Sequence, residues 1–292
     1  MECMRSATLG LIPGLAEKFD KTFSIEMFRR GNFARNFELK AQEAGQKKLI
    51  TIPYYLSLGS EFNAAALSMV LPDYMIFGQH RCHSYYLCYG GKPELLRDEL
   101  LCLPSGLCKG MSGSNSIGCP EINMFGHSGL MGEQVPIAVG AALGSGKPCL
   151  TICGDASVEE DYIYPSLGFA ASKKLPIQFI CEDNDLSILT KVEVRRSWSA
   201  ADVAKSVGMQ AISITDDPWL IAHHAKEMSK NLPGFINIYN VRVLWHAGPG
   251  TDGPPEWDRY ALVVEQMVKL GLESEVEKID QENRLKAEKI WA

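Results

Sequence analysis

Short apolar runs and amphipathic stretches alternate along the chain from about residue 132 onward. Apolar runs of strand length occur at residues 147–153, 175–181, 209–214 and 235–244. Helical spacing of apolar residues occurs at residues 132–143 and 157–173, near residue 200, and from residue 217. Strands that alternate with helices predict a mostly parallel sheet with right-handed crossovers. We therefore expect a doubly wound α/β fold with helices on both faces of the sheet.

The two ends of the chain are rich in charge and carry helical patterns. Residues 24–46 predict one or two amphipathic helices, and residues 256–290 predict two charged helices. We expect one domain over residues 1–292, with a helical N-terminal extension at 1–48 and a helical C-terminal tail at 255–292. Residues 104–129 are rich in Gly, Ser and Pro and lack periodicity, which is typical of a binding loop.

Composition and charge argue against several classes of protein. The net charge of −6 disfavours nucleic-acid binding, since phosphate backbones require a basic face. No apolar run approaches the roughly 20 residues that cross a bilayer, and the N-terminus is a poor signal peptide. The nine cysteines form no Cys-x-x-Cys pair, so we expect reduced thiols and a cytoplasmic protein. Cys149 and Cys153 share one strand face, where core packing is favoured over zinc binding.

Two successive strands end in oxygen ligands suited to a divalent cation. Asp155 follows the apolar run at 147–153, and Asn184 follows the run at 175–181. One helix joins these strands, so we expect the strands to lie side by side and both side chains to meet at one edge. A carboxylate and an amide oxygen suit magnesium, whose coordination is usually completed by phosphate oxygens. The alternative is that both are only turn and cap residues, which these types favour at strand ends.

The residues after Asp155 favour an anion at the same place. Ser157 and Glu160 form the Ser-x-x-Glu pattern of a capping box, which predicts a helix that begins at Ser157. Backbone N–H groups and the dipole at such a helix start attract an anion. Together with Gly154 and the metal pair, this helix start predicts a magnesium–diphosphate site.

The segment GDASVEEDYIYPSLGFAASKKLPIQFICEDN resembles the motif of thiamine diphosphate (ThDP) enzymes, which begins Gly-Asp-Gly and ends Asn-Asn. More narrowly, it is similar to the alpha subunit of the decarboxylating first component of 2-oxoacid dehydrogenase complexes. Further segments match that family in the same order: IPYYLSLGSEFNAAAL, FGQHRCHSYYLCYGG, GLMGEQVPIAVGAAL and VRVLWHAGPG. These collinear matches run from about residue 24 to residue 250 and imply ThDP and Mg²⁺ as cofactors.

The resemblance also implies roles for individual residues. It implies that magnesium is bound by Asp155, the Asn184 side chain and the Leu186 carbonyl. Other cofactor contacts are implied for His80, Arg81, Gly129, Met131, Gly154, Ala156, Ser157 and His246. The candidate catalytic residues are His246 and His127, and the candidate substrate contacts are Tyr55, Ser116 and His83. A surface position without a catalytic or phosphate-binding role is the alternative for His246 and Arg81.

A partner chain follows from the same resemblance. In the family, the proton relay uses a glutamate on a pyrimidine-binding domain of a beta subunit, so we expect an alpha2beta2 assembly and no turnover by this chain alone. A lipoyl-bearing acyltransferase is a further candidate partner, whereas no nucleic acid or membrane is expected. Gly132, Pro136, Gly140 and Gly144 recur every four residues, a stripe that lets another backbone approach closely. Close packing within the chain is the alternative for this stripe.

The sequence departs from the family pattern at three positions. Ala156 replaces the second glycine of Gly-Asp-Gly, which backbone phosphate binding tolerates if its φ is negative. Tyr55 and Ser116 stand where relatives carry histidines that hold a 2-oxoacid carboxylate or present a lipoyl group, and these neutral side chains offer only hydrogen bonds.

Three functions therefore stay open. The first is a 2-oxoacid or acetoin dehydrogenase subunit that decarboxylates a 2-oxoacid and passes on the acyl unit. The second is a carboligase or transketolase-like subunit that transfers a two-carbon unit in a biosynthetic pathway. The third is an inactive scaffold that binds a partner.

Overall fold

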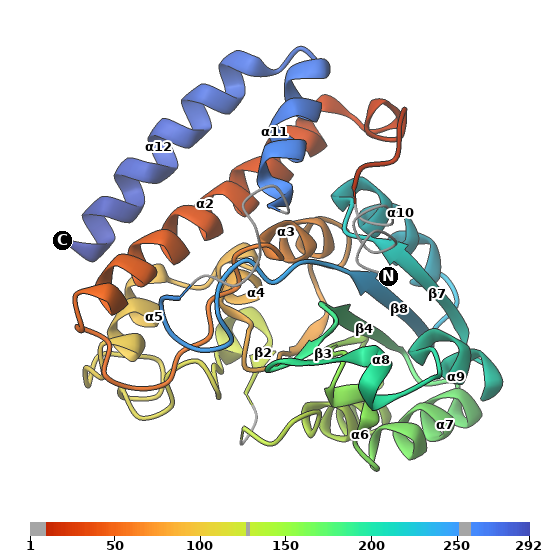
Figure 1. Cartoon of the computed structure of the whole chain (residues 1–292). Helices are drawn as coiled ribbons and strands as arrows, with labels where there is room; N and C mark the ends of the chain where they lie inside the picture. The colour runs from red at the N-terminus through yellow and green to blue at the C-terminus, as the bar shows by residue number, and fades with distance from the viewer. Residues whose placement is uncertain (1–9, 127–128, 251–257) are drawn as a thin grey trace.

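A six-stranded sheet in the order β2-β1-β3-β4-β8-β7 forms the centre of the computed structural model, which describes residues 10–126, 129–250 and 258–292 (Figure 1). Every pairing in this sheet is parallel. Its strands are β1 (Met75–Phe77), β2 (Met124–Phe125), β3 (Cys149–Gly154), β4 (Ile177–Asp183), β7 (Gln210–Thr215) and β8 (Gly234–Tyr239). A separate antiparallel pair consists of β5 (Leu186–Ser187) and β6 (Thr190–Lys191). The predicted parallel α/β sheet is confirmed.

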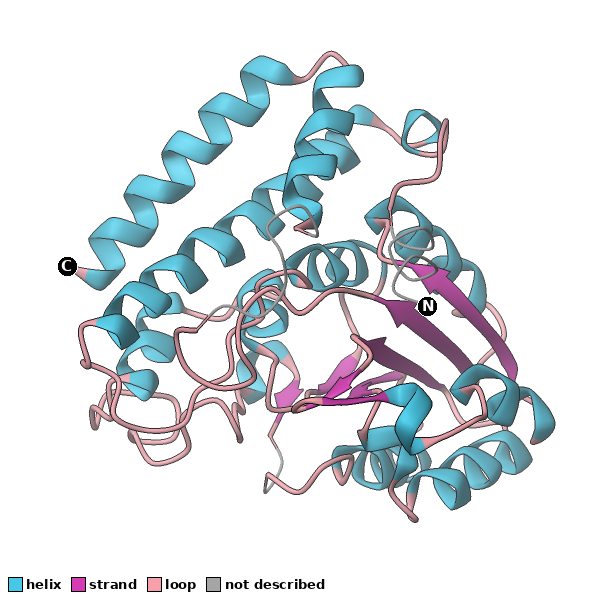
Figure 2. Ribbon diagram, viewed as in Figure 1, coloured by secondary structure: helices cyan, strands magenta, loops and turns pink. Residues whose placement is uncertain are grey.

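Helices cover both faces of this sheet (Figure 2). One face is covered by α6 (Gln134–Ser145), α7 (Ile163–Lys173) and α9 (Ala200–Ser206). The other face is covered by α3 (Glu61–Val70), α4 (His83–Cys88) and α10 (Pro218–Met228), with α2 (Lys21–Gln46), α5 (Pro93–Leu100), α11 (Arg259–Lys269) and α12 (Glu273–Trp291) packed outside them. Short helical segments are η1 (Ala16–Lys18), η2 (Pro120–Ile122), η3 (Ser157–Glu159) and α8 (Val192–Arg195).

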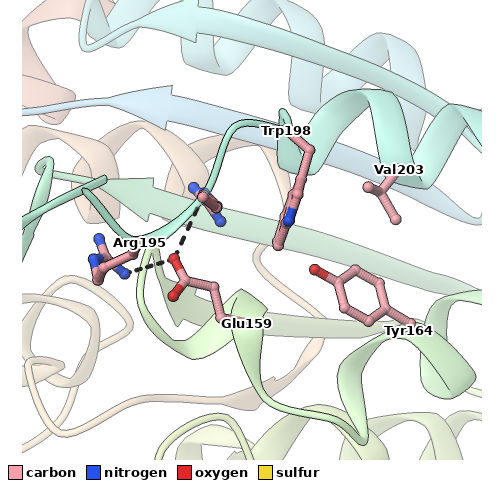
Figure 3. A pocket seen from close by; sticks show the side chains of 6 residues that line it. Glu159, Tyr164, Arg195, Trp198 and Val203 are labelled. Carbon is pink, nitrogen blue, oxygen red and sulfur yellow. Dashed lines mark hydrogen bonds and ion pairs between the residues drawn. The ribbon is translucent and has the colours of Figure 1, made fainter. Parts of the chain in front are cut away.

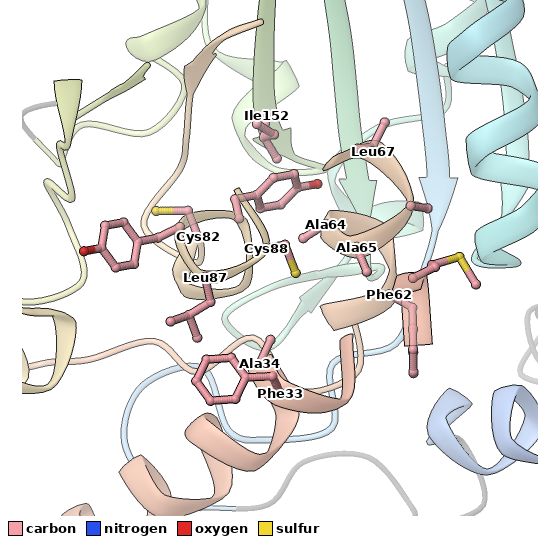
Figure 4. Close-up of a cluster of buried hydrophobic side chains, with 14 of the residues drawn as sticks. Phe33, Ala34, Phe62, Ala64, Ala65, Leu67, Cys82, Leu87, Cys88 and Ile152 are labelled. Carbon is pink, nitrogen blue, oxygen red and sulfur yellow. The ribbon is translucent and has the colours of Figure 1, made fainter. Parts of the chain in front are cut away.

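Alternate residues of the central strands enter two separate hydrophobic cores. Ile152 (Figure 4) and Ile180 pack with the helices of the α3 side, whereas Cys153 and Cys181 face α6, α7 and α9. This period of two is what a sheet buried on both faces requires. Cys149 joins Cys153 in the second core, which confirms that this pair serves packing. The eight cysteines within the described ranges are all free thiols.

The helices from the two ends of the chain pack against each other. Helix α2 is a single helix whose first turn is capped by Asp20, which accepts a hydrogen bond from the Thr22 N–H. Its Asn32 donates to Asp280 of α12 at 2.7 Å. Its Arg35 pairs with Glu61 of α3 at 2.7 Å and with Asp258, the cap of α11. These contacts tie both ends of the chain to the sheet through α3.

Two predicted elements differ from the structure. The strand expected at 235–244 ends at Tyr239, because its neighbour β4 ends at Asp183. The Asp183 carbonyl accepts a hydrogen bond from the Asn240 N–H at 2.9 Å. The helix expected at 157–173 is divided into η3 and α7 by Glu160, whose ψ of 141° is extended. A new helix then begins at Ile163, with Pro165 in its first turn, where the missing N–H costs nothing.

No helix within the described ranges combines the length and the apolar character that a bilayer crossing requires.

Candidate functional site

Asp155 and Asn184 follow adjacent strands at the carboxyl edge of the sheet. Strands β3 and β4 pair in parallel up to Gly154 and Glu182, so both chains leave the sheet side by side, as predicted. Asp155 is 1% exposed. The Asn184 side-chain oxygen accepts a hydrogen bond from the Leu186 N–H at 3.1 Å, which forms a tight turn toward β5. The edge therefore brings a buried carboxylate near an ordered amide oxygen.

Asp155 is already paired with a cationic side chain that sequence reasoning left without a role. Arg195 forms an ion pair with the Asp155 carboxylate, and its other terminal nitrogen lies 2.6 Å from Glu159 Oε1. Burial raises the pKa of Asp155 to about 7, and Asp183 adds to the rise while Arg195 opposes it. Such a carboxylate needs a positive partner when ionised, which Arg195 supplies here.

The donor types at this edge fit magnesium. Magnesium takes one or two protein oxygens and leaves the remaining positions to water and phosphate. Within the described ranges, no group of three or more His, Cys, Asp or Glu residues is placed to hold a metal ion. A divalent ion bound here would replace Arg195 as the partner of Asp155.

The predicted capping box is wrong. Ala156, not Ser157, precedes the 3₁₀ turn η3, and no side chain caps it. Glu160 ends this turn, with its backbone N–H bonded to the Ser157 carbonyl at 3.2 Å. The carboxylate of this turn that forms an ion pair is that of Glu159, which pairs with Arg195. The φ of Ala156 is −77°, which confirms that an alanine is tolerated at this position.

The loop after β1 reaches the same edge of the sheet. A Cβ atom added to Gly154 would lie 3.3 Å from Gln79 Oε1 and 3.8 Å from Ser157 Oγ, so the three residues are neighbours. Gln79 directly precedes His80 and Arg81. Gly154 therefore keeps the space between the β1 loop and the 3₁₀ turn open.

Arg81 joins two distant segments through their backbones. It donates to the Leu56 carbonyl and, at 3.0 Å, to the His246 carbonyl. Burial, together with the nearby Arg242, lowers the pKa of Arg81 to about 10. Arg81 is 8% exposed, which contradicts the surface alternative. In this structure it fixes the backbone of His246, and a phosphate contact stays a prediction.

Three predicted site residues form one cluster of rings. The Tyr55 ring centre lies 4.6 Å from that of His80 and 5.2 Å from that of His246, in edge-on arrangements. The two histidine ring centres are 5.9 Å apart. Tyr55 belongs to the segment before α3, His80 to the loop after β1, and His246 to the segment after β8. The fold thus assembles residues from three distant parts of the sequence.

His83 lies in a buried polar network behind this cluster. Its Nδ1 is 2.8 Å from Glu38 Oε1, and its Nε2 is 2.8 Å from Ser114 Oγ. Ser57 donates to the same Glu38 oxygen at 3.0 Å, and the Tyr55 N–H donates to Ser114 Oγ at 3.0 Å. Both ring nitrogens of His83 are engaged within the chain, so the network supports the position of Tyr55. A direct substrate contact of His83 stays a prediction.

The remaining predicted residues lie along the glycine-rich loop and before α6. The Ser116 carbonyl lies close to Gly126, where an added Cβ would be 2.8 Å away. Gly129 has a φ of +102°, which favours glycine. Met131 is 44% exposed, and its carbonyl accepts a hydrogen bond from the Tyr162 hydroxyl. His127 lies outside the described residues.

Two buried glutamates of the site region were missed by the sequence analysis. Glu182 accepts hydrogen bonds from Asn63, Gln79 and Tyr85 at 3.0 to 3.1 Å. Glu99 accepts four backbone N–H groups of the loop at residues 108–113, at 2.7 to 3.1 Å. Glu182 lies inside the ThDP motif, so its position in the sequence could have identified it as a site residue. Nothing in the sequence marks Glu99, because its partners are backbone groups.

Comparison with known proteins agrees with the matches noted in the sequence. The family described as the dehydrogenase E1 component matches residues 29–231. The pyruvate dehydrogenase E1 component subunit alpha of Zymomonas mobilis is 30% identical over 189 residues, which cover 62% of this chain and 53% of that protein. The somatic mitochondrial form from Homo sapiens is 30% identical over 187 residues, with 62% and 47% covered. The chain spans about half the length of the curated relatives it matches.

Solved structures with the same fold include transketolases. The enzyme from Leishmania mexicana has a TM-score of 0.58 at 16% identity, covering 90% of this chain and 46% of that one. The enzyme from Campylobacter jejuni has the same TM-score and identity, covering 93% and 49%. At such identities the likeness is one of fold. The family match, which spans most of the sheet and its helices, is the stronger finding: the chain belongs to the family of dehydrogenase E1 components.

Proposed function

We propose that this chain is the diphosphate-binding part of a ThDP- and magnesium-dependent enzyme that decarboxylates a 2-oxoacid and transfers the resulting acyl or hydroxyalkyl unit. The observation that carries the proposal is the buried Asp155 carboxylate beside the Asn184 turn at the carboxyl edge of β3 and β4. Parallel sheets bind ligands at this edge. The E1 family membership, supported by relatives named as pyruvate dehydrogenase alpha subunits, is consistent with this chemistry.

Asp155, the Asn184 side chain and the Leu186 carbonyl would hold the magnesium ion in this proposal. The diphosphate would lie against the backbone of Gly154, Ala156 and Ser157. When bound, ThDP supplies a nucleophilic carbon and an electron sink for the carbonyl chemistry. The residues of this chain would orient that group and exclude water from it.

His80, Tyr55 and His246 would line the mouth of the site. Arg81 fixes the backbone of His246, and the Ser114 hydroxyl accepts a hydrogen bond from the Tyr55 N–H. The imidazole group is the side chain that ordinarily takes up or donates a proton near neutral pH. His246 would serve as a proton donor or acceptor toward substrate, and His127, Ser116 and His83 remain candidates for the same region.

A beta subunit is proposed as the partner that completes the site, in an alpha2beta2 assembly. The exposed face of α6 supports a docked partner, since Gly140 and Gly144 have no described atom within 4 Å of an added Cβ. Ile137 and Leu143 on the same helix are 47% and 53% exposed. Gly132 is different, because its added Cβ would lie 3.1 Å from Ile163 and from the Ser157 carbonyl. The first residue of the predicted stripe therefore serves packing within the chain.

A second function is favoured by one residue. Tyr55 occupies the position where the resemblance leads us to expect a histidine, and its ring packs edge-on against both His80 and His246. A neutral contact weakens recognition of a carboxylate and suits an aldehyde or sugar acceptor better. Two-carbon transfer by a carboligase or transketolase-like subunit is therefore the alternative. The native complex should be assayed with 2-oxoacids, with and without aldehyde acceptors, and for reduction of lipoamide, which would also identify an acyltransferase partner.

The metal assignment is tested by Asp155→Ala in the assembled complex. We expect loss of magnesium-dependent ThDP binding in calorimetric titration, because the substitution removes the carboxylate that is proposed to bind the ion. Circular dichroism should show an unchanged fold. The exposed Asp161→Ala is the matched control and should bind normally. Unchanged ThDP affinity in Asp155→Ala would mean that the metal binds elsewhere.

A further inference from the structure

A polar pocket lies beside the proposed metal edge, between α7 and the segment that leads into α9 (Figure 3). Its volume is about 420 Å³, and it is lined by Glu159, Tyr164, Arg195, Arg196, Trp198 and Val203. This size is within the range of small-molecule sites in proteins. No predicted site residue lines it, and the proposed function assigns it no role.

Arg196 is the central cation of this pocket. Its side chain is 3% exposed. Two of its guanidinium nitrogens, Nε and Nη1, are buried and have no hydrogen-bond acceptor among the described residues. The nearest carboxylate oxygen, Glu159 Oε1, is 3.6 Å from Nε, beyond hydrogen-bond range. Buried guanidinium donors are normally satisfied, so this group has hydrogen-bonding capacity left for a ligand.

The surrounding groups complete an oxyanion site. The Arg196 guanidinium lies 4.6 Å from the centre of the Trp198 ring, which helps to hold it in place. The Tyr164 ring meets Trp198 edge-on at 5.5 Å, and its buried hydroxyl also has no hydrogen-bond partner within the described ranges. Figure 3 shows this hydroxyl pointing toward the centre of the group. Burial raises the pKa of Tyr164 to about 12, so the hydroxyl stays a neutral donor at physiological pH.

The charge balance of the pocket favours an added anion. Arg195 and Arg196 share Glu159, and Arg195 also neutralises Asp155. The lining of the pocket itself holds two guanidinium groups and a single carboxylate, that of Glu159. The excess positive charge and the free donors point to the same kind of ligand.

We propose that the pocket of Arg196, Arg195, Tyr164 and Trp198 is a binding site for a small molecule that carries a carboxylate or a phosphoryl group. Arg196 would bind two oxygens of that group through its planar edge, and the Tyr164 hydroxyl would donate to a third position or to the same oxygen. The Trp198 and Val203 side chains would contact the apolar part of the ligand. This site is separate from the metal edge and shares only Arg195 with it.

The purified full-length chain, without ThDP and with a chelator present, should be titrated calorimetrically with sodium phosphate and separately with sodium pyruvate. Sodium chloride of equal ionic strength is the reference. We expect saturable binding of at least one probe at one site, weakened about tenfold or more by Arg196→Gln. The exposed Arg29→Gln should bind as the parent does. Tighter binding of phosphate would indicate a ligand with a phosphoryl group, and tighter binding of pyruvate would indicate a ligand with a carboxylate.

Two results would overturn the proposal. One is the absence of saturable binding of both probes. The other is binding that Arg196→Gln leaves unchanged, because the probe would then occupy the diphosphate edge. If Arg196→Gln fails to fold, Tyr164→Phe provides the test. A severalfold weaker affinity for the probe supports the proposed site, and an unchanged affinity overturns the proposal. Since ThDP and metal are absent, failure here leaves the proposed function untouched.

Discussion

Among single residues, Glu99 determines the shape of the glycine-rich loop that carries Ser114 and Ser116. Its two carboxylate oxygens each accept two backbone N–H groups of that loop. Glu99→Gln would turn an NH2 group toward two of these donors. We expect a loss of about 2–4 kcal/mol of unfolding free energy, because buried donors would stay unsatisfied. Chemical denaturation measures this loss, and hydrogen exchange should accelerate at residues 108–113.

The exposed Glu94→Gln on the same helix is the control for Glu99→Gln and should change stability by less than about 0.5 kcal/mol. Equal stability of the two variants would contradict the role given to Glu99.

Asp216 is a residue whose titration should be visible in folding stability. Burial raises the pKa of Asp216 from 3.8 to about 6, against the opposing pull of Arg259 at 3.0 Å. The folded state therefore binds this proton more tightly than the unfolded state, so the group contributes stability at low pH that is lost as pH rises from about 4 to about 6. Relative to Asp216→Asn, the parent should lose up to about 3 kcal/mol across this interval.

Asp216→Asn also leaves the buried Arg259 without its ion pair, which adds a cost to the variant. That cost is constant between pH 4 and pH 7, because Arg259 stays charged throughout. The titration of Asp216 is therefore measured by how the difference in unfolding free energy between the parent and Asp216→Asn changes with pH. Denaturation curves at several pH values measure it, and a difference that does not vary with pH would contradict the raised pKa.

At the scale of elements, α2 packs against α3 through a glycine. A Cβ atom added to Gly31 would lie 2.5 Å from two ring carbons of Phe62. We expect Gly31→Ala to destabilise the chain by about 1–3 kcal/mol, because overpacking exceeds the gain in helix propensity.

The matched control for Gly31→Ala is Gly168→Ala in α7. No described atom lies within 4 Å of an added Cβ at Gly168. Helix propensity alone should then stabilise the chain by about 0.5–1 kcal/mol. Thermal unfolding should show a lower midpoint for Gly31→Ala and a higher midpoint for Gly168→Ala than for the parent. The packing of α2 on α3 would be misassigned if both substitutions shifted the midpoint in the same direction.

Elements were predicted best where hydrophobic period and length agreed. The strands around Asp155 and Asn184 are buried on both faces, and their apolar runs are unambiguous. The segment after Asp155 was misread, because Ser157 and Glu160 match a capping box in isolation. The ion pair between Glu159 and Arg195, 36 residues apart, contributes to a different local structure. Local patterns carry no information about such a distant partner.

The site was also predicted only in part, because many of its contacts join residues that lie far apart in the sequence. Tyr55, His80 and His246 were found through resemblance, and the structure brings their rings together. The bond from Arg81 to the His246 carbonyl could not be predicted, because a backbone acceptor leaves no mark in the sequence. Arg195 and Arg196 were visible as residues, but only the fold shows what they face.

For the whole molecule, the open face of α6 predicts dependence on a partner. Gly140→Leu should leave the isolated chain folded, since no described atom lies within 4 Å of an added Cβ, while it weakens association with the proposed beta subunit by about tenfold or more. Lys226→Leu on α10, at the other face of the sheet, is the control (Figure 1). Binding of purified subunits, followed by decarboxylation assays, measures both effects. Full turnover by this chain alone would contradict the need for a partner.

Glu38 ties the first long helix of the chain to a loop more than 60 residues away, because it bonds His83 and Ser57 while His83 bonds Ser114. All four side chains are fully buried. Replacing any one of them leaves a buried polar atom without a hydrogen-bond partner. Over evolutionary time these positions should therefore be inherited as a unit and replaced together. In an alignment of close relatives, a changed residue at 38 should be accompanied by changes at 57 and 83, whereas the exposed neighbours of Glu38 on α2 drift freely.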